Sequence, residues 1–352
     1  MEKIMIYPYS KDYEPYVKHS NFLTDGVIVS IVSPRGWGLV NNTVECGEKY
    51  LTISDQFINS LVECTTVWFV DDGRYALPTN ILLEKVSLAI KNNKKVVFTR
   101  YNDSKADFLK IHELIPEELN ITPCKIGVGD LYPMKVTYSI NTPTLVVLGA
   151  EKGTDKFEVQ MQLIDQFERK GYKCSAVSSR RDSELYGMHS IPDFMFDGNL
   201  RESDKVIQYN HYVKLIESIE KPDLIIIGIP GGILPYDGIY HNDFGILAYE
   251  ISMAIPCDAA IMCFPYNQYF SGDYSDIIHD VDIRFGFNIL GCHIAAVVPD
   301  TQDIYENLKR NLITIEKQIV RKKIESYHNE IVIDMTSKRG AEKACELIID
   351  FL

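Results

Sequence analysis

The sequence has no metal-binding cysteine or histidine motif. Its eight cysteines stand singly along the 352 residues, with no Cys-x-x-Cys pair and none beside a histidine at zinc-finger spacing. Its eight histidines show no metal-ligand spacing either. Scattered cysteines in a reduced compartment are mostly small buried apolar residues. We therefore predict neither a structural zinc site nor an iron–sulfur cluster, and we assign no metal ligands.

Long hydrophobic runs and an excess of positive charge are also missing. The longest apolar stretch, residues 224–234, contains one proline and three glycines and is far shorter than the ~20 residues of a membrane-spanning helix. The N-terminus lacks the apolar run of a signal peptide. Lys and Arg number 36 against 49 Asp and Glu, and a net charge of −13 repels nucleic-acid phosphates. We expect a cytoplasmic protein that binds neither membranes nor nucleic acid.

Short β-branched runs alternate with helical patterns along the whole chain, which is typical of parallel sheets covered by helices. Hydrophobic residues make up 46% and charged residues 24%, as in globular proteins. The length suits about two domains. We predict an α/β fold of two Rossmann-like or P-loop-like three-layer domains with mainly parallel sheets. Residues 1–128 form an N-terminal Rossmann-like domain, 129–143 a linker, and 144–352 a C-terminal domain similar to P-loop NTPases.

The predicted strands are nearly uniformly apolar, as expected of strands buried on both faces. They cover residues 3–7, 27–32, 66–70, 95–99, 144–150, 174–178, 223–228, 259–264, 289–298 and 330–334. The spacing of apolar residues predicts helices over 77–92, 157–170, 204–219, 302–327 and 338–352. One side of the helix over 302–327 is basic and is interpreted as a solvated face, with Lys317, Arg321, Lys322 and Lys323.

Residues 144–170 predict a buried strand, a polar loop at 151–156 and a helix, which is the local structure of a phosphate-binding loop. In such a loop, backbone N–H groups surround a phosphate, and the helix N-terminus adds partial positive charge. The loop keeps the lysine of the motif and has other residues that suit an anion. We take these as candidate ligand-binding residues: Lys152, Gly153, Thr154 and Lys156.

The rest of the phosphate-binding motif is damaged. Against the pattern Gly-x-x-x-x-Gly-Lys-Ser/Thr, Ala150 and Asp155 replace the glycines, and Asp155 places a carboxylate where phosphate oxygens would lie. Phe157 replaces the hydroxyl residue, and Gly228 stands where a later strand would carry an acidic metal ligand. Mg²⁺ needs hard oxygen ligands, so we predict no Mg²⁺-dependent NTPase. Two interpretations stay open: ordinary βα units without a ligand, or a nucleotide-derived site that does not hydrolyse.

Three more loops follow strands of the second domain, at the edge where α/β proteins bind ligands. The first offers arginines for a carboxylate or phosphate. The second has a Gly-Gly turn that permits close backbone approach, and the third supplies an aromatic ring and an amide. The first two are equally compatible with an ordinary surface turn. The candidate residues from these loops are Ser178, Arg180, Arg181, Pro230, Gly231, Gly232, Tyr266 and Asn267.

In the first domain, the loop Ser33-Pro-Arg-Gly-Trp-Gly directly follows a predicted strand. Arg35 and Trp37 there place a cation beside a large aromatic surface, which suits a planar or anionic ligand or a peptide. Core packing of Trp37 is the alternative. Asp71 ends another predicted strand at the same rim. We take Arg35, Trp37 and Asp71 as further candidate ligand-binding residues, and the catalytic residues, if any, stay unknown.

Three segments together resemble the peptide maturation system proteins of clostridial gene clusters, which lie beside radical-SAM peptide maturases and Cys-rich precursor peptides. They are Ile6-Tyr-Pro-Tyr with Glu14-Pro-Tyr, the Ser33-Pro-Arg-Gly-Trp-Gly loop, and the domain joint at residues 144–156. The likeness covers most of the chain. It implies a non-hydrolytic accessory protein of ribosomal peptide maturation, with a radical-SAM maturase and a Cys-rich precursor peptide as partners. We expect it to bind a partner protein, the precursor peptide or a small anionic ligand at the carboxyl ends of the strands.

A second resemblance concerns architecture alone. A Rossmann-like domain followed by a P-loop-like domain is similar to an enzyme family that includes a D-glutamate N-acetyltransferase. In that family a later strand ends in Glu-Gly-Gln-Gly, where this sequence has Gly228-Ile-Pro-Gly-Gly. The alternative function is thus an acyl- or phosphoryl-transfer enzyme that uses a nucleotide or CoA-like cofactor, with Lys152 and Lys156 as anion clamps and no conventional Mg²⁺ site. The sequence requires no cofactor and leaves the oligomeric state open.

Overall fold

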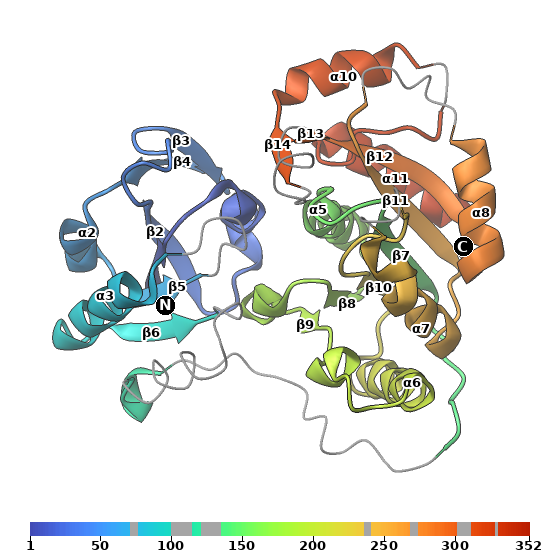
Figure 1. Cartoon of the computed structure of the whole chain (residues 1–352), viewed down its shortest axis with the longest axis horizontal. Coiled ribbons are helices and arrows are strands. Elements are labelled where there is room, and N and C mark those ends of the chain that lie inside the picture. The colour runs from blue at the N-terminus through green and yellow to red at the C-terminus, as the bar shows by residue number, and fades with distance from the viewer. Residues whose placement is uncertain are drawn as a thin grey trace. The chain divides into compact units, whose positions relative to one another are not determined.

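The computed structural model describes residues 1–70, 77–99, 115–120, 135–235, 241–267, 274–300, 311–327 and 330–352. Contacts divide the chain into two compact units, drawn in Figure 1. Unit 1 comprises Met1–Lys125 and Asp182–Gly187, and unit 2 comprises Ile126–Arg181 and Met188–Leu352. The candidate residue Asp71 lies outside the described residues.

Unit 1 is built on a six-stranded sheet in the order β3-β4-β2-β1-β5-β6. The strands are β1 (Glu2–Tyr7), β2 (Gly26–Val32), β3 (Thr43–Cys46), β4 (Lys49–Ser54), β5 (Thr66–Phe69) and β6 (Lys95–Phe98). β3 and β4 pair antiparallel at one edge, and the other pairings are parallel. Numbered along the chain, the parallel strands therefore run 3-2-1-4-5, the order of a Rossmann sheet.

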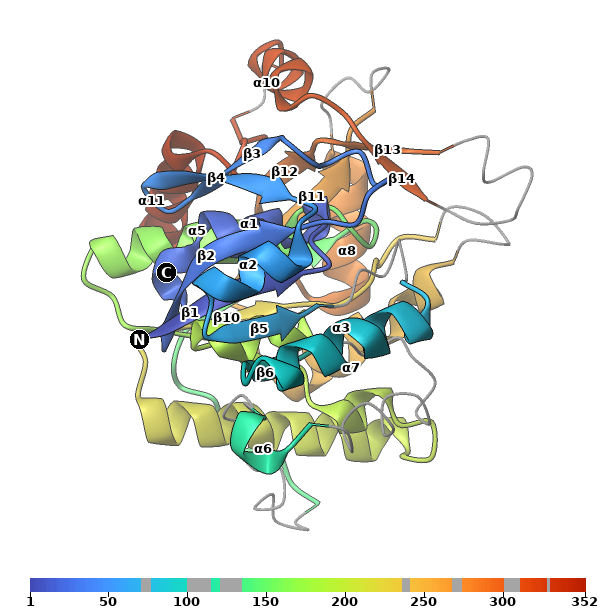
Figure 2. The same ribbon diagram turned by 90° about the vertical axis from the view of Figure 1, so that its left-hand side faces the viewer.

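Helices cover both faces of the unit 1 sheet. α2 (Phe57–Glu63) and α3 (Thr79–Lys91) lie in front of the strands in Figure 2 and bury a core with Met5, Phe69 and Val86. On the other face, Trp68 is fully buried, and its ring centroid lies 5.4 Å from that of Tyr16 in α1 (Glu14–Lys18). Short 3-10 helices complete the unit: η1 (Lys11–Tyr13), η2 (Ser20–Phe22) and η3 (Glu117–Leu119).

Unit 2 contains a fully parallel six-stranded sheet in the order β12-β11-β7-β10-β8-β9. The strands are β7 (Thr144–Gly149), β8 (Cys174–Ser178), β9 (His189–Ser190), β10 (Leu224–Gly228), β11 (Ala259–Pro265) and β12 (Ile289–Ala295). Every residue of the central strand β7 is buried, because helices cover both faces. The parallel arrangement brings the loops after β7, β8, β10 and β11 to one edge of the sheet.

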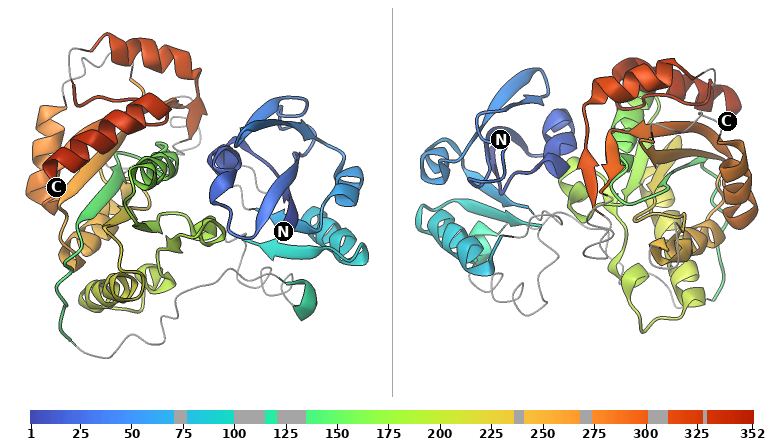
Figure 3. Two further views of the ribbon diagram at one scale, coloured as in Figure 1. Left: turned by 180° about the vertical axis from the view of Figure 1, so that it is seen from behind. Right: turned by 45° about the horizontal axis from the view of Figure 1, so that its top comes forward.

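Two groups of helices cover the unit 2 sheet. α5 (Lys156–Arg169) and α11 (Lys338–Phe351) lie side by side, as Figure 3 shows. α6 (Glu202–Glu220), α7 (Ile246–Ala254) and α8 (Ser275–Phe285) pack on the face to which Val146 and Leu148 point. The remaining elements are η6 (Asp193–Phe196), η7 (Asn242–Gly245), the antiparallel pair β13 (Val297–Pro299) and β14 (Leu312–Thr314), and α10 (Lys317–Glu325). None of the helices in the described ranges is long and apolar enough to cross a membrane.

Unit 1 also takes in a short segment from the second half of the chain, within η5 (Arg181–Tyr186). Tyr186 is 3% exposed, and its hydroxyl donates a hydrogen bond of 2.7 Å to the Tyr16 carbonyl. The two ring centroids lie 5.0 Å apart. The backbone N–H and the hydroxyl of Thr24 both donate to the Leu185 carbonyl at 3.2 Å. The segment therefore completes the aromatic core of unit 1.

The predicted fold class is confirmed: both units are α/β, and their sheets are mainly parallel. Two predicted elements are wrong. The helix over residues 302–327 does not form as such, because residues 312–314 pair with β13 as strand β14 and α10 begins only at Lys317. In place of a strand at 330–334, a single bridge joins Val332 to Cys292.

Candidate functional site

The loop of residues 150–155, called here the β7–α5 loop, connects the central strand of unit 2 to a helix, as predicted. Hydrogen bonds from neighbouring segments hold its first residue, Ala150. The Ala150 N–H donates to the Cys263 carbonyl in β11 at 2.8 Å, and the Ala150 carbonyl accepts from the Leu234 N–H at 3.3 Å. The side-chain amide of Asn242 also donates to the Ala150 carbonyl, at 3.1 Å. The start of the loop is therefore fixed from both sides.

Lys156 is the first residue of α5, and its ammonium group is turned into the loop. The residue is 6% exposed, and its Nζ donates to the carbonyls of Glu151, at 2.8 Å, and Gly231. Burial lowers the pKa of Lys156 from 10.5 to about 8. Lys156 thus ties the loop to the Gly-Gly turn that follows β10.

That turn, Pro230–Gly231–Gly232, packs directly on the β7–α5 loop. A Cβ at Gly232 would lie 2.7 Å from both the Ala150 carbonyl oxygen and the Glu151 Cα, so no other residue fits without movement. Gly231 has φ +74°, in the left-handed region that favours glycine. The sequence predicted that these glycines let the backbone approach a ligand closely. In the structure they let the turn approach the β7–α5 loop.

Backbone N–H groups of the β7–α5 loop are available to an anion. Those of residues 152–155 make no hydrogen bond within the described part of the chain. Gly153 and Asp155 have φ of +81° and +58°, and left-handed residues within such a loop turn neighbouring N–H groups toward a shared concavity. The 14-residue helix α5 adds partial positive charge at this end. The loop therefore has the donors and the charge of an anion-binding site.

The residues at the two metal-supporting positions do not fit Mg²⁺. Phe157 is 5% exposed and offers no oxygen. A Cβ at Gly228 would lie 2.2 Å from the Oε1 of Gln160, which is 0% exposed and whose Nε2 donates to the Val177 carbonyl at 3.2 Å. Gln160 thus fills the space that an acidic side chain at the end of β10 would need. No step of metal-assisted hydrolysis follows from this arrangement.

Asp155 directs its carboxylate toward His293. It is the N-cap residue of α5, but its side chain makes no capping hydrogen bond. Its Oδ2 lies 3.6 Å from the Nε2 of His293, a residue of β12 that is 1% exposed. The Nδ1 of His293 accepts the backbone N–H of Met335 at 3.2 Å. The carboxylate of the aspartate that replaces a glycine of the motif thus lies 3.6 Å from a buried imidazole of unit 2.

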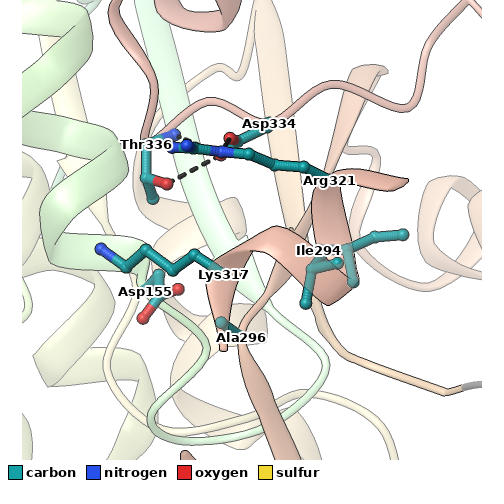
Figure 4. Close-up of a pocket in the computed structure, with 8 residues that line it drawn as sticks. Asp155, Ile294, Ala296, Lys317, Arg321, Asp334 and Thr336 are labelled. Carbon is teal, nitrogen blue, oxygen red and sulfur yellow. Dashed lines mark hydrogen bonds and ion pairs between the residues drawn. The ribbon is translucent and has the colours of Figure 1, made fainter. Parts of the chain in front are cut away.

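A small hollow lies beside Asp155, shown in Figure 4 with the side chains of Lys317, Arg321, Asp334 and Thr336 around it. The Arg321 Nε donates to Asp334 Oδ2 at 2.8 Å, and the Thr336 hydroxyl donates to Asp334 Oδ1 at 2.7 Å. Burial of Asp334 opposes its ionisation, but these hydrogen bonds outweigh burial and hold the pKa of Asp334 below its ordinary value. Lys317 and Arg321, which were predicted to lie on a solvated face, have side chains that are 41% and 47% exposed and also line this hollow.

The loops after β8 and β11 place the other candidates of unit 2. The Arg180 guanidinium lies 5.4 Å from the centre of the Phe157 ring, at the start of α5. Ser178 is buried, and its hydroxyl accepts the Arg180 N–H at 3.1 Å, so it shapes the turn. The Tyr266 N–H donates to the Val297 carbonyl at 2.8 Å, and its ring is partly buried against the core. Asn267 is exposed. The side chain of Arg181 lies outside the described part of the structure.

Arg35 and Trp37 belong to unit 1. The Arg35 side chain is 80% exposed and pairs with the carboxylate of Asp55. Trp37 is partly buried and packs against the core that contains Phe57. Trp37 is therefore neither a fully exposed contact residue nor a fully buried core residue.

Sequence reasoning did not name several residues of the site. Gln160 gave a weak signal, because it lies one turn after Lys156 on a helix whose neighbours are apolar. Asp334 ends a predicted strand, which is a position where α/β proteins often place polar ligand contacts. His293 gave no signal, since nothing in its sequence neighbourhood distinguishes it from a core residue of β12.

No family model matches the sequence, and no curated protein matches it. Among solved structures, the chain is similar to a DUF1611 family protein from Anabaena variabilis ATCC 29413, with 10% identity over 99% of this chain and 100% of that chain and a TM-score of 0.66. It also matches the cobyrinic acid a,c-diamide synthase of Mycobacterium smegmatis (11% identity, 59% of this chain and 94% of that chain, TM-score 0.35). A third match is the MinD cell division protein of Aquifex aeolicus (13% identity, 59% and 97%, TM-score 0.36). At these identities the first likeness establishes a shared two-domain α/β fold and nothing about activity.

Proposed function

We propose that this chain is a non-hydrolytic binding protein that holds an anionic group of its ligand at the β7–α5 loop. The observation that carries the proposal is the set of consecutive N–H groups at residues 152–155, without partners in the described chain, at the N-terminus of α5. Phosphate and carboxylate oxygens accept several such donors at once. The buried Nε2 of His293, which has no hydrogen-bond partner in the described chain, points toward the same end of α5.

Two further features favour binding without hydrolysis. The ammonium of Lys156 is hydrogen-bonded to backbone carbonyls, so it reinforces the loop. The positions that would bring Mg²⁺ to a phosphate are filled by Phe157 and by Gln160 against Gly228. Phosphoryl transfer depends on such electrostatic support of the transition state. A nucleotide, pyrophosphate or a CoA-like molecule can supply the anionic group, and the exposed Lys152 adds positive charge at the mouth of the loop.

We also propose, from the sequence resemblance, that binding serves ribosomal peptide maturation. The partner would be a radical-SAM maturase or its Cys-rich precursor peptide. Arg35, with its 80% exposed side chain, and the partly buried Trp37 offer a contact surface in unit 1. Native mass spectrometry of the full chain with maturase and peptide tests this role. A stable complex supports it, and separate species at micromolar concentration would contradict it.

Isothermal titration of the full chain with pyrophosphate, ATP and CoA tests the anion site. We expect binding of at least one of them in EDTA, with the same affinity after Mg²⁺ is added. Lys152→Ala should weaken it about fivefold, the effect of losing ~1 kcal/mol of exposed charge attraction. Lys170→Ala is the matched control, because Lys170 lies at the opposite end of α5 and pairs with Glu346.

Three outcomes of the same titrations would contradict the proposal. One is the absence of binding for all three anions, and another is an equal effect of the two lysine variants. The third is Mg²⁺-dependent ATP turnover at an ordinary enzyme rate of ~1 s⁻¹. Acetyl transfer from acetyl-CoA to an added amine would favour the transferase alternative.

A further inference from the structure

We infer that His293 is a positioning residue for anion binding, which keeps the carboxylate of Asp155 away from the N–H groups of the β7–α5 loop. The inference rests on the proposed anion site. It explains how that site can bind an anion although an aspartate stands within the loop. Asp155 stands at a glycine position of the phosphate-binding motif, and a carboxylate lying over the loop would repel an anion.

The hydrogen bonds of His293 fix where its proton lies. The backbone N–H of Met335 is an obligatory donor, and it lies 3.2 Å from Nδ1. The Ile333 carbonyl is farther from the same atom, at 3.4 Å. In the neutral imidazole, Nδ1 is therefore the acceptor and Nε2 carries the proton. That Nε2 has no hydrogen-bond partner among the described residues, and it lies 3.6 Å from Asp155 Oδ2.

Asp155 has another position available to it. Aspartate at an N-cap commonly accepts a hydrogen bond from the second or third N–H group of its helix. In this structure the carboxylate of Asp155 makes no such bond and lies on the side of His293 and the hollow in Figure 4. Without His293, the carboxylate can turn to the start of α5. Its negative charge would then lie beside the N–H groups of the loop and repel the anion that they bind.

A double-mutant cycle on pyrophosphate binding by the full chain tests this role. His293→Ala should weaken binding about tenfold. Asp155→Gly suits the φ of +58° at this position, and in the His293→Ala background it should restore the affinity to within about twofold of Asp155→Gly alone. A merely structural effect of His293→Ala would persist in the double variant. His211→Ala is the matched control, because His211 is also buried in unit 2 but hydrogen-bonds the Val136 carbonyl.

The ¹⁵N chemical shifts of the two His293 ring nitrogens report the tautomer in the absence of ligand, and we expect the Nε2–H form. The Nδ1–H form would overturn the inference. So would an unchanged affinity in His293→Ala, or a double variant as weak as His293→Ala. If the wild-type chain binds no anion, the proposed function fails, and the positioning role fails with it.

Discussion

Gly228→Ala should destabilise unit 2, because the space beside Gly228 is already filled. The added Cβ would lie 2.2 Å from the Oε1 and 2.6 Å from the Cδ of Gln160, closer than non-bonded atoms can approach. Gln160 is 0% exposed, and its Nε2 donates to the Val177 carbonyl at 3.2 Å. The amide must therefore move within a packed interior and give up that hydrogen bond.

The expected cost follows from three contributions. Overpacking a core by one methyl group costs ~1–3 kcal/mol, and the lost hydrogen bond adds ~1 kcal/mol. Replacing glycine by alanine returns ~0.5–1 kcal/mol, since the unfolded chain has less freedom. The net loss is about 1–3.5 kcal/mol. For a unit of this size, each kcal/mol lowers Tm by ~2–4 °C.

Scanning calorimetry of the full chain measures this change in the unit 2 transition. Gly198→Ala is the control, because no atom lies within 4 Å of a Cβ at that position. In the double variant Gln160→Ala/Gly228→Ala, the new methyl group enters the space that Gln160 leaves. The double variant should therefore lose about 1–2 kcal/mol less than the sum of the two single variants. Equal Tm values for Gly228→Ala and Gly198→Ala would refute the packing explanation for the missing acidic residue.

Three further predictions concern other parts of the chain. Tyr186→Ala should lower the unfolding free energy of unit 1 by about 3–5 kcal/mol in calorimetry, because Tyr186 is 3% exposed. Tyr50 is 73% exposed, so the control Tyr50→Ala should cost less than ~0.5 kcal/mol. Similar losses in the two variants would contradict the burial of Tyr186. Trp37→Ala should lower the unfolding free energy, measured by chemical denaturation, less than half as much as Trp68→Ala, because Trp68 is fully buried and Trp37 only partly. Equal losses would make Trp37 a core residue. Burial lowers the pKa of Lys156 from 10.5 to about 8, so the unfolded chain holds this proton more tightly and stability should rise from pH 8 to 10.5. Relative to Lys156→Met, the unfolding free energy should gain up to about 3 kcal/mol over that range, and a flat difference would contradict the burial of the ammonium.

The alternation of apolar strands and amphipathic helices was enough to predict the α/β fold and most strands. Strand β7 is a clear case, because burial on both faces leaves a uniformly apolar run that few other structures produce. The hairpin of β3 and β4 escaped prediction, since most of its residues are exposed or only partly buried and form no apolar run. The error at residues 302–327 has a similar origin: Leu312–Thr314 forms a strand only through its pairing with β13.

The parts of the site that are formed by residues close together in the sequence could be predicted. The parts that depend on packing between segments far apart in the sequence could not. The loop around Lys156 could be recognised from its strand, loop and helix pattern. Two partners of that loop could not, because Asn242 and His293 reach it from a loop and a strand far along the chain. The burial of Tyr186 in unit 1 is another long-range feature, since a segment after β8 crosses into the other unit.

Amide NMR of the full chain in EDTA, titrated with pyrophosphate, tests the central claim most directly. If the β7–α5 loop holds the anion, the N–H signals of Lys152, Gly153, Thr154 and Asp155 should shift most, because hydrogen bonding to an anion strongly deshields an amide proton. The amides of β3 and β4 in unit 1 should stay in place. Saturable shifts confined to unit 1, or no shift at the loop at millimolar pyrophosphate, would contradict the claim.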